Sequence, residues 1–341
     1  MAIDRLKPAL DTDAPGCAWI IACDGAGEAE AGVSGHLRQP PDGGFAWAHF
    51  DRSDRRSAQT LRDLGRLEAD ELDALVGPID HQFIEQTDSR TFGAVVDHVS
   101  SIAGRTHETD YLRFVFGQDF IFTARLRPLQ SADAVRRALG AGPAPDRPEG
   151  LFEELIAAIC DSCGAITKEI ARDLDRIEDR VILDGEGREQ RAALGHARRT
   201  AVRLQRQIGG LTSTMKRLEE AAAEPDRQHL ADAAATLAQR AEALARDIAA
   251  LQDRARLLQE EVNAILTLET NDRLYILTIV TTLLLPATFV TGYFGMNTRQ
   301  LLFFENDNGT LFATLLCAAA SAIALVTLRR FGIARAPSRH S

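Results

Sequence analysis

The tripeptide Gly295-Met296-Asn297 closes an apolar segment near the C-terminal end and carries groups that could bind a hydrated cation. The side-chain carbonyl of Asn297 can accept a hydrogen bond from water around a cation, and Gly295 lets the backbone come close. A simpler alternative is that Asn297 only caps the end of a helix at Gly295.

A stripe of small, hydroxyl-bearing and apolar residues precedes this tripeptide at alternating steps of three and four. Such steps keep side chains on one face of a helix. The members of this stripe are Thr288, Leu285, Thr281, Thr278, Leu274 and Asn271. Because lipid favours Leu, Ile and Val, the threonines predict a face that meets other helices or a water-filled lumen. The alternative is that each hydroxyl only bonds back to the carbonyl four residues earlier.

The same region lacks the side chains that hold divalent metals tightly. Between Leu274 and Phe304 the sequence contains no Asp, Glu, His or Cys, which are the ligands that tightly bound zinc requires. Magnesium loses its water reluctantly. We therefore expect a largely hydrated ion to pass, with no tight metal site and no resident cofactor. This reasoning applies equally to zinc, magnesium, cobalt and nickel.

Acidic residues at both ends of the stripe could concentrate cations. Glu305 and Asp307 follow the tripeptide and would form a ring of carboxylates in an oligomer. Glu260, Glu261 and Glu269 precede the stripe and could draw ions through on the inner side. The alternative for each acid is a solvated surface.

Two apolar segments must position these residues. Residues 274–298 and 310–328 contain no charged side chain, and each is long enough to cross a bilayer core of about 30 Å as a helix. The residues after 328 carry Arg329, Arg330, Arg335 and Arg339. Basic segments remain on the cytoplasmic side, so we expect a multi-pass protein of the inner (plasma) membrane with both termini in the cytoplasm.

The rest of the chain has a soluble character. The segments CAWIIACD and FAWAHFD predict strands, YLRFVFGQDFIFTARLR predicts a hairpin that turns at Gly117-Gln118-Asp119, and QTLRDLGRLEADELDALV has helical periodicity. Helices are expected from about Leu151 to Leu183 and from about Glu189 to Ala223. A further helix continues to Phe294 with Pro286 as its one internal breaker. Close to 70 residues would span on the order of 100 Å, so this helix is predicted to begin as a cytoplasmic stalk.

The predicted organisation is an α+β cytoplasmic domain followed by a long stalk helix and two transmembrane helices. The expected parts are a cytoplasmic α+β domain (1–145), a helical region with the stalk (146–273), a pore-lining transmembrane helix (274–298), an external loop (299–309), a second transmembrane helix (310–328) and a basic cytoplasmic tail (329–341).

Charge and motifs exclude several classes of function. Setting aside the five Arg and two acids after residue 273 leaves 34 of the 39 basic and 47 of the 49 acidic residues, a formal charge of −13. An acidic body does not suit nucleic acid. The sequence has no G-x-x-x-x-G-K-[ST] loop for a nucleotide-driven pump and no recognisable nucleophile–base pair, so we do not expect an enzyme.

The segment TFVTGYFGMN at the end of the first span resembles the CorA superfamily of divalent metal ion transporters. The acidic domain, the long helix, the short loop and the basic tail match that family's order along essentially the whole chain. WAHFDRSDRRSAQTLRDL and the hairpin TGYFGMNTRQLLFFENDNGTLFATLL look most like the zinc transporter ZntB branch. Where the magnesium branch usually has Met-Pro-Glu-Leu, this loop has LLFFENDN, which disfavours magnesium.

The resemblance implies a homopentameric funnel in which the first span of each subunit lines the pore. It also implies that Gly295, Met296 and Asn297 form the selectivity ring. The leading hypothesis is a divalent cation transporter or channel for zinc, with a magnesium or cobalt channel of the same superfamily as the alternative. A hypothesis from another class is a membrane-anchored coiled-coil scaffold or sensor, in which Asn297 would have no role.

Overall fold

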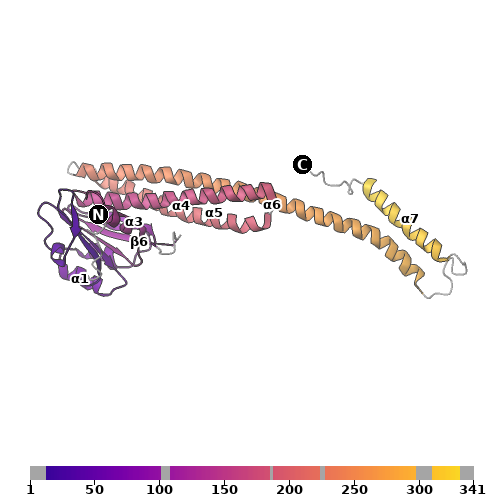
Figure 1. Cartoon of the computed structure of the whole chain (residues 1–341), viewed down its shortest axis with the longest axis horizontal. Coiled ribbons are helices and arrows are strands. Elements are labelled where there is room, and N and C mark those ends of the chain that lie inside the picture. The colour runs from indigo at the N-terminus through magenta and orange to yellow at the C-terminus, as the bar shows by residue number, and fades with distance from the viewer. Residues whose placement is uncertain (1–12, 101–107, 185–186, 223–226, 297–308, 331–341) are drawn as a thin grey trace. The chain divides into compact units, whose positions relative to one another are not determined.

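A seven-stranded sheet lies beside a bundle of long helices in the N-terminal part of the chain (Figure 1). The computed structural model describes residues 13–100, 108–184, 187–222, 227–296 and 309–330. These residues form two compact units. The first extends to Asp179 and includes Ala193–Leu257, and the second comprises Arg180–Ala192 and the described residues from Leu258 onward.

The strand order in the sheet is β2-β1-β3-β7-β6-β5-β4. All neighbouring strands are antiparallel except β3 and β7, which run parallel. The strands are β1 (Cys17–Cys23), β2 (Ala29–Ala31), β3 (Phe45–Asp51), β4 (Phe83–Gln86), β5 (Thr91–His98), β6 (Thr109–Phe116) and β7 (Phe120–Arg125). The central strands β3 and β7 are almost entirely buried, as is the second half of β6, which indicates that both faces of the sheet are covered.

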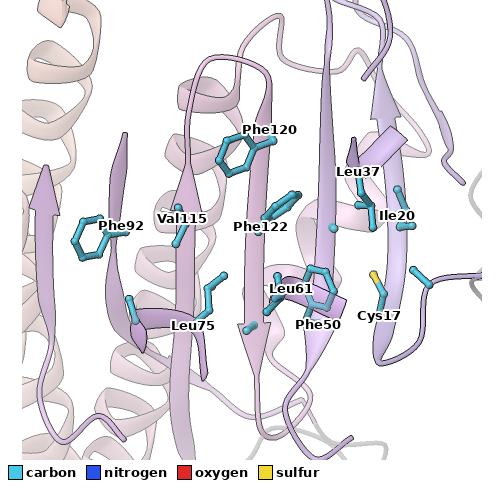
Figure 2. Close-up of a cluster of buried hydrophobic side chains, with 14 residues drawn as sticks. Cys17, Ile20, Leu37, Phe50, Leu61, Leu75, Phe92, Val115, Phe120 and Phe122 are labelled. Carbon is cyan, nitrogen blue, oxygen red and sulfur yellow. The ribbon is translucent and has the colours of Figure 1, made fainter. Parts of the chain in front are cut away.

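One face of the sheet carries an apolar core that short helices cover. Alternate residues of a strand point to one face, and Phe50, Phe122 and Val115 of neighbouring strands meet there (Figure 2). The 3-10 helix η1 (Ser34–Leu37), α1 (Arg56–Leu64) and α2 (Ala69–Val76) contribute Leu37, Leu61 and Leu75 to this core. Each of these leucines is at most 1% exposed.

The opposite face of the sheet packs against α3 (Gln130–Leu139) and α4 (Pro148–Asp184). Phe114 and Phe116 of β6 contact Phe152 of α4 at ring-centroid distances of 4.8 and 5.0 Å. Farther along the same face, the side chains that point towards the helices become more polar. They are those of Trp19, Trp47, His49 and Thr123. This face therefore combines an apolar region under α4 with a polar region.

The structure confirms the two predicted strands and the hairpin but not the single helix over 59–76. That segment forms two helices, because Gly65 ends α1 with a backbone φ of +63°, a conformation that favours glycine. The periodicity continues across the break because α1 and α2 both place leucines against the same sheet face.

Three long helices, α4, α5 (Gly187–Ala221) and α6 (Gln228–Phe294), form a bundle in the first unit (Figure 1). Arg240 of α6 pairs with Asp161 of α4, and Arg254 pairs with Asp175. Both pairs are separated by 79 residues along the chain, so α4 and α6 run parallel with a constant offset. The two pairs lie 14 residues apart, which is the length of two heptads of a coiled coil.

The predicted long helix to Phe294 is confirmed as α6, which contains 67 residues with Pro286 inside it. Within the second unit, α6 is followed by α7 (Gly309–Arg330). Ser321 of α7 donates a hydrogen bond to the carbonyl oxygen of Leu283 at 3.0 Å, and the Cys317 thiol lies 3.7 Å from the carbonyl oxygen of Ala287. These contacts identify the side of α6 that packs against α7.

Candidate functional site

The predicted stripe lies on the C-terminal half of α6 and is exposed along its whole length. Its members Asn271, Leu274, Thr278, Thr281, Leu285 and Thr288 are all exposed in the single chain. Leu274 and Leu285 are 54% and 64% exposed. An apolar side chain this open on a long helix requires another surface, either lipid or a second subunit.

The stripe faces away from α7. Residues of an α-helix advance by about 100° each, which places Leu283 and Ala287 on the opposite side of α6 from Thr281 and Thr288. Val290, which is 8% exposed, also lies on the α7 side. The contacts with α7 therefore leave the stripe uncovered within the chain.

The threonine hydroxyls of the stripe bond back to the helix, as the simpler alternative expected. Thr278, Thr281 and Thr288 each donate to the carbonyl oxygen four residues earlier, at 2.8 Å in every case. A hydroxyl oxygen keeps acceptor capacity after it donates its one hydrogen. These bonds thus leave the threonine oxygens on the exposed face able to accept hydrogen bonds, so the back-bonding and a polar lumen are compatible.

One residue of this face was missed by the sequence reasoning. A further step of four from Thr288 reaches Gly292, and a step of three from there reaches Gly295. A Cβ atom at Gly292 would meet nothing within 4 Å. The stripe therefore ends at a position that has no side chain and has free space beside the backbone. The signal for it is the same alternating spacing, which continues from Thr288 towards the C-terminus.

The tripeptide Gly295-Met296-Asn297, predicted to form a selectivity ring, is only partly described. The amide nitrogen of Gly295 donates to the Thr291 carbonyl oxygen at 2.9 Å, which continues the helical bonding beyond Phe294. Met296 is 51% exposed. Asn297, Glu305 and Asp307 lie outside the described residues, so the proposed ring and the outer acids stay predictions.

The inner acids Glu260, Glu261 and Glu269 all lie on α6. Glu260 and Glu261 are exposed and Glu269 is half-buried. Glu269 lies 3.7 Å from Arg273 one turn later, so its charge is partly offset within the helix. In the part of the chain that the structure describes, no group of three His, Cys, Asp or Glu side chains is placed to hold a metal ion.

The apolar half of α6 meets the requirements for crossing a membrane. Its most apolar stretch has a mean hydropathy of 1.9 and is only 6% buried. Within the described residues it is the one helix that is long and apolar enough by these measures, since the apolar part of α7, Thr314–Thr327, is shorter. The second predicted span thus stays a prediction.

The chain thus combines a sheet covered by helices on both faces, a bundle of long helices and an exposed apolar face on α6. Comparison with known proteins gives the family. The sequence profile of the CorA-like Mg2+ transporter proteins matches residues 42–330, so the chain belongs to the CorA family. That family consists of transporters.

Three relatives illustrate the similarity. The chain is 24% identical over 285 residues to the divalent cation transporter CmaX of Pseudomonas aeruginosa, covering 83% of this chain and 86% of the relative. The full-length CmaX structure matches with a TM-score of 0.75 at 21% identity, covering 94% of this chain and 99% of CmaX. The complete CorA magnesium transporter of Methanocaldococcus jannaschii matches with a TM-score of 0.73 at 15% identity, covering 92% and 98% of the two chains.

The third relative bears on the predicted branch. The cytoplasmic domain of ZntB from Vibrio parahaemolyticus matches with a TM-score of 0.61 at 13% identity, covering 73% of this chain and 98% of that domain. Likeness at this identity concerns the fold alone. The CorA superfamily is confirmed, whereas the ZntB branch stays a prediction.

Proposed function

We propose that this protein transports divalent metal cations across the plasma membrane through a pore lined by the α6 stripe. Membership of the CorA family supports transport, and the name of the curated relative CmaX supports divalent cations as the cargo. The observation that carries the assignment of the pore face is that the stripe points away from α7. One side of α6 is thus available to face copies of itself around an axis.

The proposed assembly is a homopentamer. A single α6 helix cannot enclose water, and the family resemblance implies five subunits. The exposed stripe supports this proposal because leucines that are more than half exposed would be covered, or would face a narrow lumen, at a symmetric axis.

The stripe would conduct a cation that keeps its water. Threonine oxygens that have already donated to the helix can accept hydrogen bonds from the water molecules around the ion. Leu274 and Leu285 would form apolar constrictions that gate by dewetting. Gly295, Met296 and Asn297 would form the selectivity ring, and Glu305 and Asp307 would attract cations to the outer mouth.

Zinc is the cargo we favour, with magnesium and cobalt as alternatives within the same family. The preference for zinc rests on the segments that resemble ZntB and on the loop sequence LLFFENDN, which stands in place of Met-Pro-Glu-Leu. A hydrated ion in a lumen of threonines and leucines gives only modest discrimination between metals. Selectivity therefore has to be measured directly.

The test is uptake into liposomes that contain the purified protein, comparing zinc, magnesium and cobalt with and without a pH gradient. Zinc uptake above magnesium uptake is expected. Magnesium uptake above zinc would overturn the cargo but not the transporter. A complete lack of metal flux, together with wild-type behaviour of Asn297→Ala in cells, would favour the scaffold hypothesis.

Two neighbouring threonines provide a matched pair for the pore face. Thr281 and Thr282 both donate to a carbonyl oxygen four residues earlier, at 2.8 and 2.7 Å, but they lie about 100° apart around the helix. Replacing Thr281 by Val removes an acceptor oxygen from the stripe and is expected to lower flux. Thr282 lies at the edge of the stripe, one turn after Thr278, so Thr282→Val should lower flux less, and equal effects of the two substitutions would argue against the stripe as the pore wall.

A further inference from the structure

A group of buried N–H donors without acceptors lies on the polar region of the sheet face that α3 covers. Ten buried side-chain polar atoms lack a partner among the described residues, and five of them come from Trp19, His49, Arg125 and Arg136. Buried donors without acceptors are rare in native proteins and point to an unassigned water or ion. Their concentration at one place is therefore informative.

Ring contacts join Trp19, His49 and Arg136, and the strand register places Arg125 on the same sheet face. The His49 and Trp19 rings stack with centroids 4.1 Å apart and planes inclined by 16°. The guanidinium carbon of Arg136, on α3, lies 5.2 Å from the Trp19 ring. Arg125 follows Thr123 by two residues on β7, and Thr123 pairs in register with His49, so Arg125 and His49 share a sheet face.

The hydrogen bonds around His49 indicate which of its two ring nitrogens carries the hydrogen. Thr123 Oγ1 accepts from Trp47 Nε1 at 2.9 Å and lies 2.7 Å from His49 Nδ1. Its other contact, to the Ala48 carbonyl oxygen, is long at 3.4 Å. We assign the Thr123 hydrogen to the shorter of the two contacts, the one with His49 Nδ1. This tautomer places the His49 hydrogen on Nε2, which has no hydrogen-bond partner among the described residues.

The cluster also carries uncompensated positive charge. Neither Arg125 nor Arg136 forms an ion pair with a carboxylate among the described residues. Asp51 is opposite Arg125 in the strand register, but its Oδ1 accepts from the Ser53 amide and hydroxyl at 2.8 and 2.6 Å. Burial holds the pKa of His49 well below its ordinary value, and the charges of Arg125 and Arg136 lower it further. Two guanidinium groups beside neutral buried donors favour a negatively charged ligand.

We propose that Trp19, His49, Arg125 and Arg136 form a binding site for a small monovalent inorganic anion of the halide class. The indole and imidazole N–H groups are more than nine-tenths buried, since Trp19 is 8% and His49 0% exposed. A compact anion can accept from several such donors at once, whereas water must also place two hydrogens of its own. The nearby arginines supply the charge that a water molecule would not need.

The chain offers a built-in probe, because its two tryptophans are Trp19 and Trp47 and their ring centroids lie 5.7 Å apart in this cluster. Sodium iodide is titrated against the full-length protein in detergent, with sodium gluconate holding the ionic strength constant. Saturable quenching of tryptophan fluorescence is expected, with chloride competing for the same site. Chloride should also raise the melting temperature relative to gluconate.

Three variants test the assignment, with folding checked by far-ultraviolet circular dichroism. Arg136→Gln and Arg125→Gln should each raise the half-saturating iodide concentration by about tenfold or more, the effect of losing one charge-assisted hydrogen bond. Arg137→Gln is the control, because Arg137 is exposed on the same helix and donates to the Asp133 carbonyl oxygen. It should bind as the wild type does.

Quenching that stays linear in iodide, with the same melting temperature in chloride and gluconate, would mean that only water occupies the cluster and would overturn the proposal. An equal loss of binding in Arg137→Gln would do so as well, since it would indicate general surface charge. If Arg136→Gln does not fold, the comparison of Arg125→Gln with Arg137→Gln decides.

Discussion

At the scale of single residues, Asp97 couples the end of β5 to the start of α3. Its carboxylate is fully buried and accepts from the Ser131 amide and hydroxyl at 3.1 and 2.6 Å, and from the His98 amide at 2.7 Å. These bonds stabilise the anion, but burial outweighs them and raises the pKa of Asp97 to about 6. Asp97 is therefore a buried acid that titrates near neutral pH.

Replacing Asp97 by Asn should remove a pH dependence of stability. Because the folded-state pKa is raised above its ordinary value of 3.8, the contribution to stability is full below about pH 4 and is lost as pH rises through about 6. The wild type should thus lose on the order of 3 kcal/mol from this group across that window, and Asp97→Asn should not. Melting temperatures from pH 4 to 7 measure the difference, with the exposed Asp88→Asn as control. Parallel curves for the wild type and Asp97→Asn would contradict the assignment.

Gly292 tests whether the stripe continues beyond Thr288. Since a Cβ atom there would meet nothing within 4 Å of the chain, Gly292→Leu should fold normally. If the face lines a pore, the larger side chain narrows it, so metal flux in liposomes should fall to a small fraction of the wild-type value, and Gly292→Ala should reduce it less. Thr291→Leu, about 100° away around the helix, should retain flux. Full flux in Gly292→Leu would place this residue outside the pore.

Sequence patterns identified one exposed face of α6 but not the buried polar groups. The stripe depends on local spacing within one helix, which the sequence displays directly. Asp97 and Ser131 are 34 residues apart, and His49 and Thr123 are 74 residues apart. Such partners become neighbours only when the sheet and α3 pack, so no local pattern identifies them.

At the scale of elements, a glycine with positive φ determines where a helix ends. Periodicity predicted one helix over residues 59–76, but the left-handed backbone of Gly65 separates α1 from α2. The strands of the hairpin and the long helices were predicted correctly because their apolar patterns are continuous. The apolar periodicity does not report a change in backbone conformation at a single glycine, so it could not predict this break.

Gly16 and Gly65 should respond very differently to substitution by Ala. Both have positive φ, +78° and +63°, so a side chain is strained at either position. At Gly65 an added Cβ meets nothing within 4 Å, and the expected cost is about 1–2 kcal/mol. At Gly16 it would lie 2.4 Å from the Ser57 amide nitrogen, so a cost above about 3 kcal/mol is expected. Melting temperatures of the two variants give the order, and equal losses would show that the contact with Ser57 relaxes.

At the scale of the whole molecule, the proposed homopentamer can be tested by cross-linking along α6. Thr281 and Val280 are adjacent and exposed, but they lie about 100° apart around the helix. Thr281→Cys should form disulfide-linked subunits under mild oxidation, since the stripe would face other copies at the axis. Val280→Cys should cross-link much less.

The native cysteines should contribute little cross-linking of their own. Four of them are buried and one is partly covered, namely Cys17, Cys23, Cys160 and Cys163, and Cys317. Wild-type protein under the same oxidation measures what remains. Mass measurement in detergent should give five subunits. Equal cross-linking at positions 280 and 281 would argue against a stripe-facing axis.

The order of parts along the chain was predictable to a large extent. Hydropathy identified the apolar segment of α6, and the TFVTGYFGMN segment with its surroundings pointed to the CorA family that the profile of residues 42–330 establishes. The choice of metal was not predictable in the same way. If the ion passes with its water in place, as proposed for a face of Thr and Leu, the residue types along that face carry little information about which ion the water surrounds.

The bonds that tie Thr278, Thr281 and Thr288 to their own helix have a consequence for the sign of charge that the face tolerates. Each of these hydroxyls donates its only hydrogen within the helix, so these three threonines present acceptor lone pairs and no donor on the exposed face. An anion beside them would find no hydroxyl donor, whereas a cation or its water would find an oxygen acceptor. Rejection of anions can thus be built into an uncharged wall by the internal bonding of the helix, without any acidic residue in the membrane.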